Sequence, residues 1–217
     1  MKTRILVLSF IIFFFNCKSQ DCPQGINVLP MYGNAKKCKE QLESDKEFLA
    51  EMDKKFDNRK DAAKSLVKSG WDYFYKNDYN TSMKRFNQAW MITKEMYEIY
   101  WGFGNLVAIQ GNPEDALKYF DLAKKYNPQN SDFYSSSAIA YSQIFLKNNN
   151  KEFLKSAIKD LETGLKINPK NAKLYSLLST SYFYLKDMKN AKAYFKKADE
   201  IDSSAINEEY RKIITSK

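Results

Sequence analysis

One pattern of large and small side chains recurs along this chain at a spacing of 34 residues, and it constrains the fold more than any other feature. Residues 97–130 contain a complete unit of it. The unit places its key residues in a fixed order: Tyr100, Phe103, Gly104, Val107, Ala116, Phe120, Ala123 and Pro128. Small residues let two helices approach closely, while large ones fill the spaces between their turns. The unit therefore predicts two packed antiparallel helices.

The sequence also predicts the boundary between those two helices. Asn112 and Pro113 provide a helix cap followed by a proline at the first helical position, and Glu114 and Asp115 place acids in the first turn. Pro128 ends the second helix.

The same order recurs in residues 63–96, 131–171 and 172–205. The third unit is seven residues longer than the others, with the extra residues around 144–150. We expect its first helix to be about two turns longer and to end at Asn148-Asn149-Asn150.

This pattern resembles the tetratricopeptide repeat (TPR) family. The resemblance implies an all-α fold, a right-handed superhelical solenoid of about four helix-turn-helix repeats with capping helices at both ends. The expected organisation is a lipoprotein-type signal peptide at 1–16, a flexible tether at 17–39, a capping helix at 40–62, four repeats at 63–205 and a second cap at 206–217.

The first residues are typical of an export signal. Lys2 and Arg4 precede an apolar run, residues 5–15, that is too short to span a bilayer as a helix. Cys17 then resembles the lipid-attachment cysteine of bacterial lipoproteins, and Lys18 after it resembles outer-membrane sorting. The resemblance implies an exported outer-membrane lipoprotein facing the periplasm or the cell surface. The alternative is an ordinary cleaved signal with a free cysteine nearby.

Cys22 and Cys38 remain as a possible disulfide, with two free thiols as the alternative. The chain has no histidine, and two cysteines alone do not make a closed metal site. We therefore predict no metal, no cofactor and no enzyme activity, because most acid–base arrangements need histidine.

Residues 26–32 form an apolar stretch within the predicted tether. We expect it to pack on the first helices. Two alternatives are that it is a linear motif offered to a partner, or that it folds back as a plug in the groove of the solenoid.

The net charge of +9 raises the question of nucleic acid. The basic residues are almost all lysine, whereas proteins that read bases and phosphates favour arginine. With an export signal as well, the charge is better explained by solvated helix faces.

The TPR resemblance implies that the first helix of each repeat lines a concave groove. The predicted ligand-binding residues on that face are Trp71, Phe74, Tyr75, Trp101, Asn105, Ser135 and Gln143. Trp71 and Trp101 fall outside the core positions of the pattern, so we expect a ligand or the chain itself to cover them.

The groove lacks the residues with which chaperone-binding TPR domains hold a C-terminal carboxylate. The matching positions are Val67, Trp71, Asn105, Ser135 and Ile139, and of these only Asn105 fits.

The favoured function is a non-enzymatic scaffold of the cell envelope that binds a protein or peptide partner in its concave face. The alternative is a glycan-binding lipoprotein in which Trp71, Tyr75 and Trp101 stack on sugar rings. A glycosidase pair, Glu98 with Asp132, ranks last. The sequence predicts neither the partner nor the oligomeric state.

Overall fold

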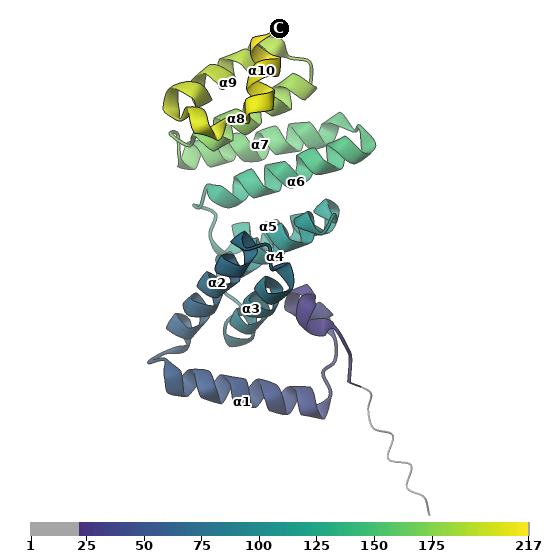
Figure 1. Ribbon diagram of the computed structural model, residues 1–217, viewed down its shortest axis with the longest axis vertical. Helices are drawn as coiled ribbons and strands as arrows, with labels where there is room; N and C mark the ends of the chain where they lie inside the picture. The colour runs from purple at the N-terminus through teal and green to yellow at the C-terminus, as the bar shows by residue number, and fades with distance from the viewer. Residues whose placement is uncertain (1–21, 217) are drawn as a thin grey trace, which may run out of the picture.

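The computed structural model describes residues 22–216, and this part of the chain is a stack of helix pairs without β-strands (Figure 1). The pairs are α2 (Arg59–Tyr75) with α3 (Tyr79–Ile92), α4 (Tyr97–Ile109) with α5 (Pro113–Tyr126), α6 (Asp132–Asn148) with α7 (Lys151–Ile167), and α8 (Ala172–Tyr184) with α9 (Met188–Ile201). The expected all-α solenoid is confirmed.

Single helices close the two ends of the stack. α1 (Lys39–Lys55) lies across the end formed by α2 and α3, and α10 (Glu208–Thr215) covers the other end after the short turn η3 (Ser203–Ala205) (Figure 1). Among residues 22–216, no helix combines the length and the apolar character that crossing a membrane requires.

Glycines on the first helices allow the two helices of a pair to approach closely. A Cβ atom added at Gly104 on α4 would lie 2.5 Å from Cε1 of Phe120 on α5, and one added at Gly70 would lie 2.9 Å from Cζ of Phe86. Both distances are too short for real carbon contacts. The predicted role of Gly104 in close helix packing is therefore confirmed.

Side-chain caps begin most of these helices. Asp78 Oδ1 accepts a hydrogen bond from the Thr81 backbone N–H, and Asn58, Asn150, Asn171, Asp187 and Asn207 cap their helices in the same way. Asn112 stands before Pro113 at the predicted place, but its side chain makes no capping hydrogen bond.

The third pair corrects one prediction. The extra residues are not all in its first helix: α6 has 17 residues where α4 has 13, and α7 has 17 where α5 has 14. Each helix is therefore about one turn longer. α6 does end at Asn148, and Asn149 follows in the left-handed conformation that ends many helices.

The apolar core divides into two clusters at α6. One extends from Met52 to Ala140 and fills the first two pairs, and the other begins at Ala138 and fills the last two. A polar group joins the halves: Asp160 on α7 accepts hydrogen bonds from Lys124 on α5 and Ser137 on α6.

Residues 22–38 form an ordered strap rather than the predicted flexible tether. Its turns η1 (Ile26–Val28) and η2 (Pro30–Asn34) pack on α3, where the buried Asn87 side chain donates hydrogen bonds to the carbonyls of Asn27 and Leu29, at 2.9 and 2.8 Å. The strap thus packs on the first repeat, as expected. The alternative that residues 26–32 plug the groove is wrong, because η1 and η2 contact α3, which is a second helix and does not line the groove.

Four consecutive residues of the strap, 31–34, are left-handed, with φ between 54° and 62°. This conformation costs about 1–2 kcal/mol for each non-glycine residue. Tertiary contacts offset the cost: the Tyr32 N–H donates to Asn87 Oδ1, and the Lys37 ammonium lies 3.4 Å from the centroid of the Tyr32 ring.

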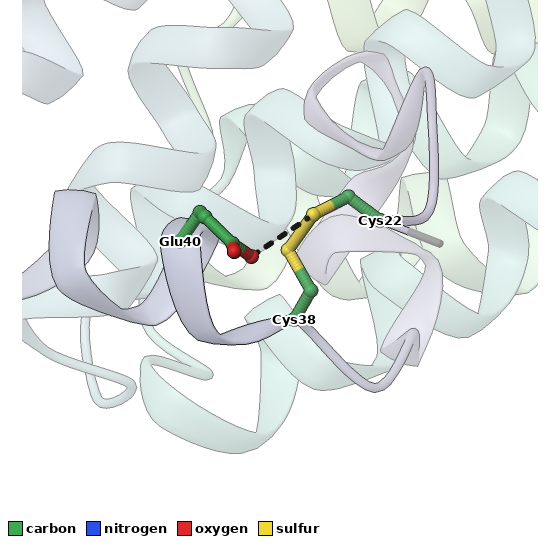
Figure 2. Close-up of side chains that lie close together, drawn as sticks. All are labelled: Cys22, Cys38 and Glu40. Carbon is green, nitrogen blue, oxygen red and sulfur yellow. Dashed lines mark hydrogen bonds between the residues drawn. A yellow bond between two sulfur atoms is a disulfide. The ribbon is translucent and has the colours of Figure 1, made fainter. Parts of the chain in front are cut away.

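A disulfide joins the start of the strap to the start of α1. Figure 2 shows Cys22 bonded to Cys38, whose Cα atoms are 5.1 Å apart, with the Glu40 carboxylate beside them. The Gln41 side chain bridges the same two segments, since it accepts from the Cys38 N–H and donates to the Pro23 carbonyl. Both ends of the strap are therefore fixed.

Candidate functional site

The first helices of the four pairs form one continuous surface. α2 contacts α4, α4 contacts α6, and α6 contacts α8, whereas each second helix contacts mainly its own partner and the next first helix. The predicted ligand-binding residues all lie on α2, α4 and α6, so this inner surface is the candidate site.

Trp71 on α2 lies within a cluster of rings. Its ring centroid is 4.7 Å from that of Trp101, 5.4 Å from that of Phe74, 6.1 Å from that of Tyr75 and 5.3 Å from that of Phe86. The two tryptophans therefore cover each other in part, and both remain partly exposed. Their contact joins the first repeat to the second.

Several polar groups of the predicted groove residues form hydrogen bonds within the solenoid. Trp101 Nε1 donates to Ser136 Oγ at 2.9 Å, and Asn105 Nδ2 donates to the Trp101 carbonyl at 2.8 Å. Ser135 is buried and donates to the Asp132 carbonyl. Val67 is buried as well, so two of the five positions that correspond to a carboxylate clamp are closed to a ligand.

Four exposed apolar side chains continue the inner surface along one edge. Each lies in the last turn of a first helix, and we call them the apolar row: Tyr75, Ile109, Leu146 and Tyr184. Tyr75 is the most exposed of them, at 75%. The Phe145 ring, 5.7 Å from Tyr184 between centroids, connects the third and fourth repeats along this edge.

A cavity of about 370 Å³ separates two members of the row. Ile109 and Leu146 both line it, together with Gln143 and Lys147. Gln143 Oε1 is buried and has no hydrogen-bond partner among the described residues. Lys147 is fixed at the rim, since its ammonium donates to the Gly111 carbonyl at 2.7 Å.

Leu146 was missed in the sequence. The other three members of the row share one position of the repeat pattern, and in the longer third repeat that position falls on Gln143. Because α6 continues for another turn, the exposed apolar residue of its last turn is three residues later. The extra length of the third repeat could have revealed Leu146, because a longer first helix moves the exposed position of its last turn further along the chain.

Burial raises the pKa values of two tyrosines on the first helices. Burial raises the pKa of Tyr100 to about 12 and also raises that of Tyr134, so both hydroxyls stay neutral and instead donate to the carbonyls of Lys94 and Pro128. Glu98 and Asp132 lie in the first turns of α4 and α6, where acids stabilise helix starts.

The remaining predicted residues lie outside the groove. Cys17 is outside residues 22–216. Glu40 Oε2 lies 3.5 Å from Cys22 Sγ (Figure 2), but the sulfurs of a disulfide are neither thiol donors nor thiolate ligands. In the oxidised protein this cluster is therefore not a metal site.

Residues 172–204, which form the fourth repeat, match the family model of the tetratricopeptide repeat. No curated protein matches the chain.

Among solved structures, TTC0263, a thermophilic TPR protein of Thermus thermophilus, aligns with a TM-score of 0.60 and 18% identity over 65% of this chain and 75% of that chain. YrrB, a TPR protein with an unusual peptide-binding site, aligns with a TM-score of 0.53 and 18% identity over 76% of this chain and 81% of its own. PilF of Pseudomonas aeruginosa aligns with a TM-score of 0.59 and 14% identity over 67% of this chain and 63% of its own. The family match of the fourth repeat and the solenoid fold shared with these structures together support the conclusion that this chain is a tetratricopeptide-repeat protein.

Proposed function

We propose that this protein is a non-enzymatic scaffold of the cell envelope that binds a protein or peptide on the inner surface of its solenoid. The observation that carries the proposal is the apolar row. Exposed apolar side chains scattered singly need no explanation, but one in the last turn of each of four successive first helices indicates a surface that a partner covers.

The geometry of the row suits an extended segment. Packed helices lie about 8–10 Å apart, so neighbouring first helices present their row residues at about that spacing. A chain in the extended polyproline II conformation advances about 3.1 Å per residue with three residues per turn, so every third side chain of such a peptide lies on one face and meets the next member of the row. The cavity between Ile109 and Leu146 would accept one apolar side chain of such a peptide.

Two further observations support the proposal. The solved structure of YrrB is described as having a peptide-binding site, which makes peptide binding by a solenoid of this fold a reasonable analogy. The disulfide between Cys22 and Cys38 suits an oxidising compartment outside the cytoplasm, in agreement with the export signal expected from the first residues.

A photo-crosslinking amino acid placed at position 146 tests the site. In intact cells we expect it to yield a discrete crosslinked product that positions on the convex side do not give. The matched control is position 201 on α9, where Ile201 is also exposed and apolar but lies on a second helix. Equal crosslinking at both positions would show that the row is not the binding surface.

A further inference from the structure

The apolar row begins and ends with a tyrosine. Tyr75 on α2 is 75% exposed and Tyr184 on α8 is 43% exposed, while the two members between them are aliphatic. The Tyr75 ring stacks on the ring of Trp71, one helical turn earlier, with centroids 6.1 Å apart and planes inclined by 29°. We call this stacked pair, Trp71 with Tyr75, the aromatic ledge.

The aromatic ledge also presents hydrogen-bond donors. Among residues 22–216, neither the Trp71 indole N–H nor the Tyr75 hydroxyl has a hydrogen-bond partner, and neither group is buried. The indole of Trp101 differs, because its N–H already donates to Ser136. A ligand that lies on the ledge therefore meets two ring faces and two free donors.

A proline-rich segment matches this combination of rings and donors. Proline has no backbone N–H, so a proline-rich backbone presents carbonyl oxygens that need donors and has few N–H groups that need acceptors. Aromatic side chains bind such segments well, because their flat faces pack on proline rings and the preformed polyproline II helix loses little entropy on binding. The indole N–H and the phenol O–H add a polar end to each ring.

The apolar row also has the period of a polyproline II helix. Three residues of that helix advance about 9 Å, which lies within the spacing of about 8–10 Å between packed helices. The four members of the row therefore correspond to about ten residues of one bound segment. A β-strand fits less well, because its side chains alternate between two faces and the third residue would point away from the row.

The middle of the row favours a peptide over a glycan. Ile109 and Leu146 line the cavity of about 370 Å³, which suits a large apolar side chain such as leucine. Sugar hydroxyls placed against these two side chains would lose water and gain no hydrogen bond. A segment with an apolar residue at every third position and prolines between satisfies both the cavity and the ledge.

We propose that the inner surface binds a proline-rich segment in the polyproline II conformation, with a large apolar residue at every third position. The inference rests on the function proposed above, because it names the class of peptide for the same surface.

The probe for the test is the decapeptide N-acetyl-Pro-Pro-Leu-Pro-Pro-Leu-Pro-Pro-Leu-Pro-amide. It is titrated into the isotope-labelled oxidised protein, and the indole N–H signals of the three tryptophans are followed by nuclear magnetic resonance. We expect the Trp71 signal to shift and to saturate. Trp90 is the internal control, because it lies on α3, outside the inner surface, and its signal should stay in place.

A second peptide, in which serine replaces every proline, tests the conformation. It keeps the spacing of the leucines but restores the N–H groups and the flexibility of the backbone. We expect it to bind at least about tenfold more weakly, because it loses more backbone entropy on binding.

Two variants of Tyr75 separate its ring from its hydroxyl. Tyr75→Ala removes half of the ledge and should weaken binding of the proline peptide at least about tenfold, while circular dichroism shows that the fold is retained. Tyr75→Phe keeps the ring and loses the donor, so it should weaken binding by about two- to tenfold. Tyr126→Phe, the same change on the second helix α5, is the matched control and should bind like the parent.

The proposal is overturned if the Trp71 signal does not move, if the serine peptide binds as tightly as the proline peptide, or if Tyr75→Ala binds like the parent. A trimer of N-acetylglucosamine that binds at Trp71 more tightly than the proline peptide would assign the surface to glycans and would equally overturn it.

The crosslinking experiment distinguishes failure of this inference from failure of the proposed function. A discrete product at position 146 but not at 201, together with equal binding of the two peptides, would retain the function and reject the peptide class. Equal crosslinking at both positions would reject the function itself.

Discussion

At Gly104 the approach of two helices depends on the absence of a single side chain. The Phe120 ring occupies the space where a Cβ atom would stand. Since the ring is buried and surrounded by core residues, it has no room to move away.

Gly104→Leu should therefore lower the free energy of unfolding by about 1–3 kcal/mol or more through overpacking. Urea unfolding of the oxidised protein measures this. Gln110→Leu, at the exposed C-terminal end of the same helix, is the control and should change it by less than about 0.5 kcal/mol. An unchanged midpoint for the glycine variant would mean that α4 and α5 are not in contact at this residue.

Tyr100 predicts a loss of stability at high pH. Its pKa rises from about 10 in the unfolded chain to about 12 in the folded protein, mainly because burial disfavours the phenolate. The neutral hydroxyl thus contributes stability that is complete below pH 10 and is lost as the pH rises toward 12. Comparison of unfolding free energies at pH 9 and about pH 11.5 should show a smaller decrease for Tyr100→Phe than for the parent. Parallel curves would exclude this residue as a source of the loss.

Among the elements, the strap differs most from what the sequence predicted. In sequence it has prolines, glycines and no periodicity, which is why a flexible tether was predicted. Its order depends on Asn87, a polar residue in the middle of an amphipathic helix about 60 residues further along, and on a disulfide. No local pattern reveals such long-range partners, whereas the helix pairs follow from local patterns and were predicted.

Reduction of the disulfide should destabilise the strap. Closing a loop of this length contributes about 3 kcal/mol by the chain-entropy estimate. Hydrogen exchange of the Asn27 to Tyr32 amides should become faster in the presence of dithiothreitol. A Cys22→Ser, Cys38→Ser protein should exchange fast with or without reductant, and a reductant effect that persists in it would rule out this cause.

The polar group between α5, α6 and α7 joins the two apolar clusters. Asp160→Ala leaves the partly buried Lys124 and Ser137 without their acceptor, so we expect a loss of about 1–3 kcal/mol. Asp115→Ala, which breaks the exposed pair with Lys118, should cost almost nothing. Equal losses in thermal melts of the two variants would show that Asp160 contributes no more than a surface acid.

For the whole molecule, the repeat period was enough to predict the all-helical solenoid and its inner surface. It was not enough to predict which side chains stay exposed there. Trp71 and Trp101 were expected to be covered by a ligand or by the chain itself, and in the folded chain their rings lie 4.7 Å apart and partly cover each other. Mutual shielding depends on the offset between neighbouring repeats, which the period does not fix.

Lipid attachment at Cys17 also belongs to the whole molecule and stays a prediction. Cys17→Ser should move the protein from the membrane fraction to the soluble fraction, because several acyl chains contribute about 0.8 kcal/mol per buried CH₂. Fractionation and immunoblotting compare the variant with the parent, and Cys22→Ser serves as the control. A serine variant that stays in the membrane fraction would contradict the assignment.

The position of the disulfide also sets a length. Cys22 is covalently fixed to the start of α1, so a lipid on Cys17 would be attached five residues before a fixed point of the fold. Because a chain spans at most about 3.6 Å per residue, the distance from Cys17 to Cys22 would be less than about 20 Å. The first repeat would then stay close to the bilayer surface while the fourth stands farthest from it, and the protein would search for partners mainly by lateral diffusion in the plane of the membrane.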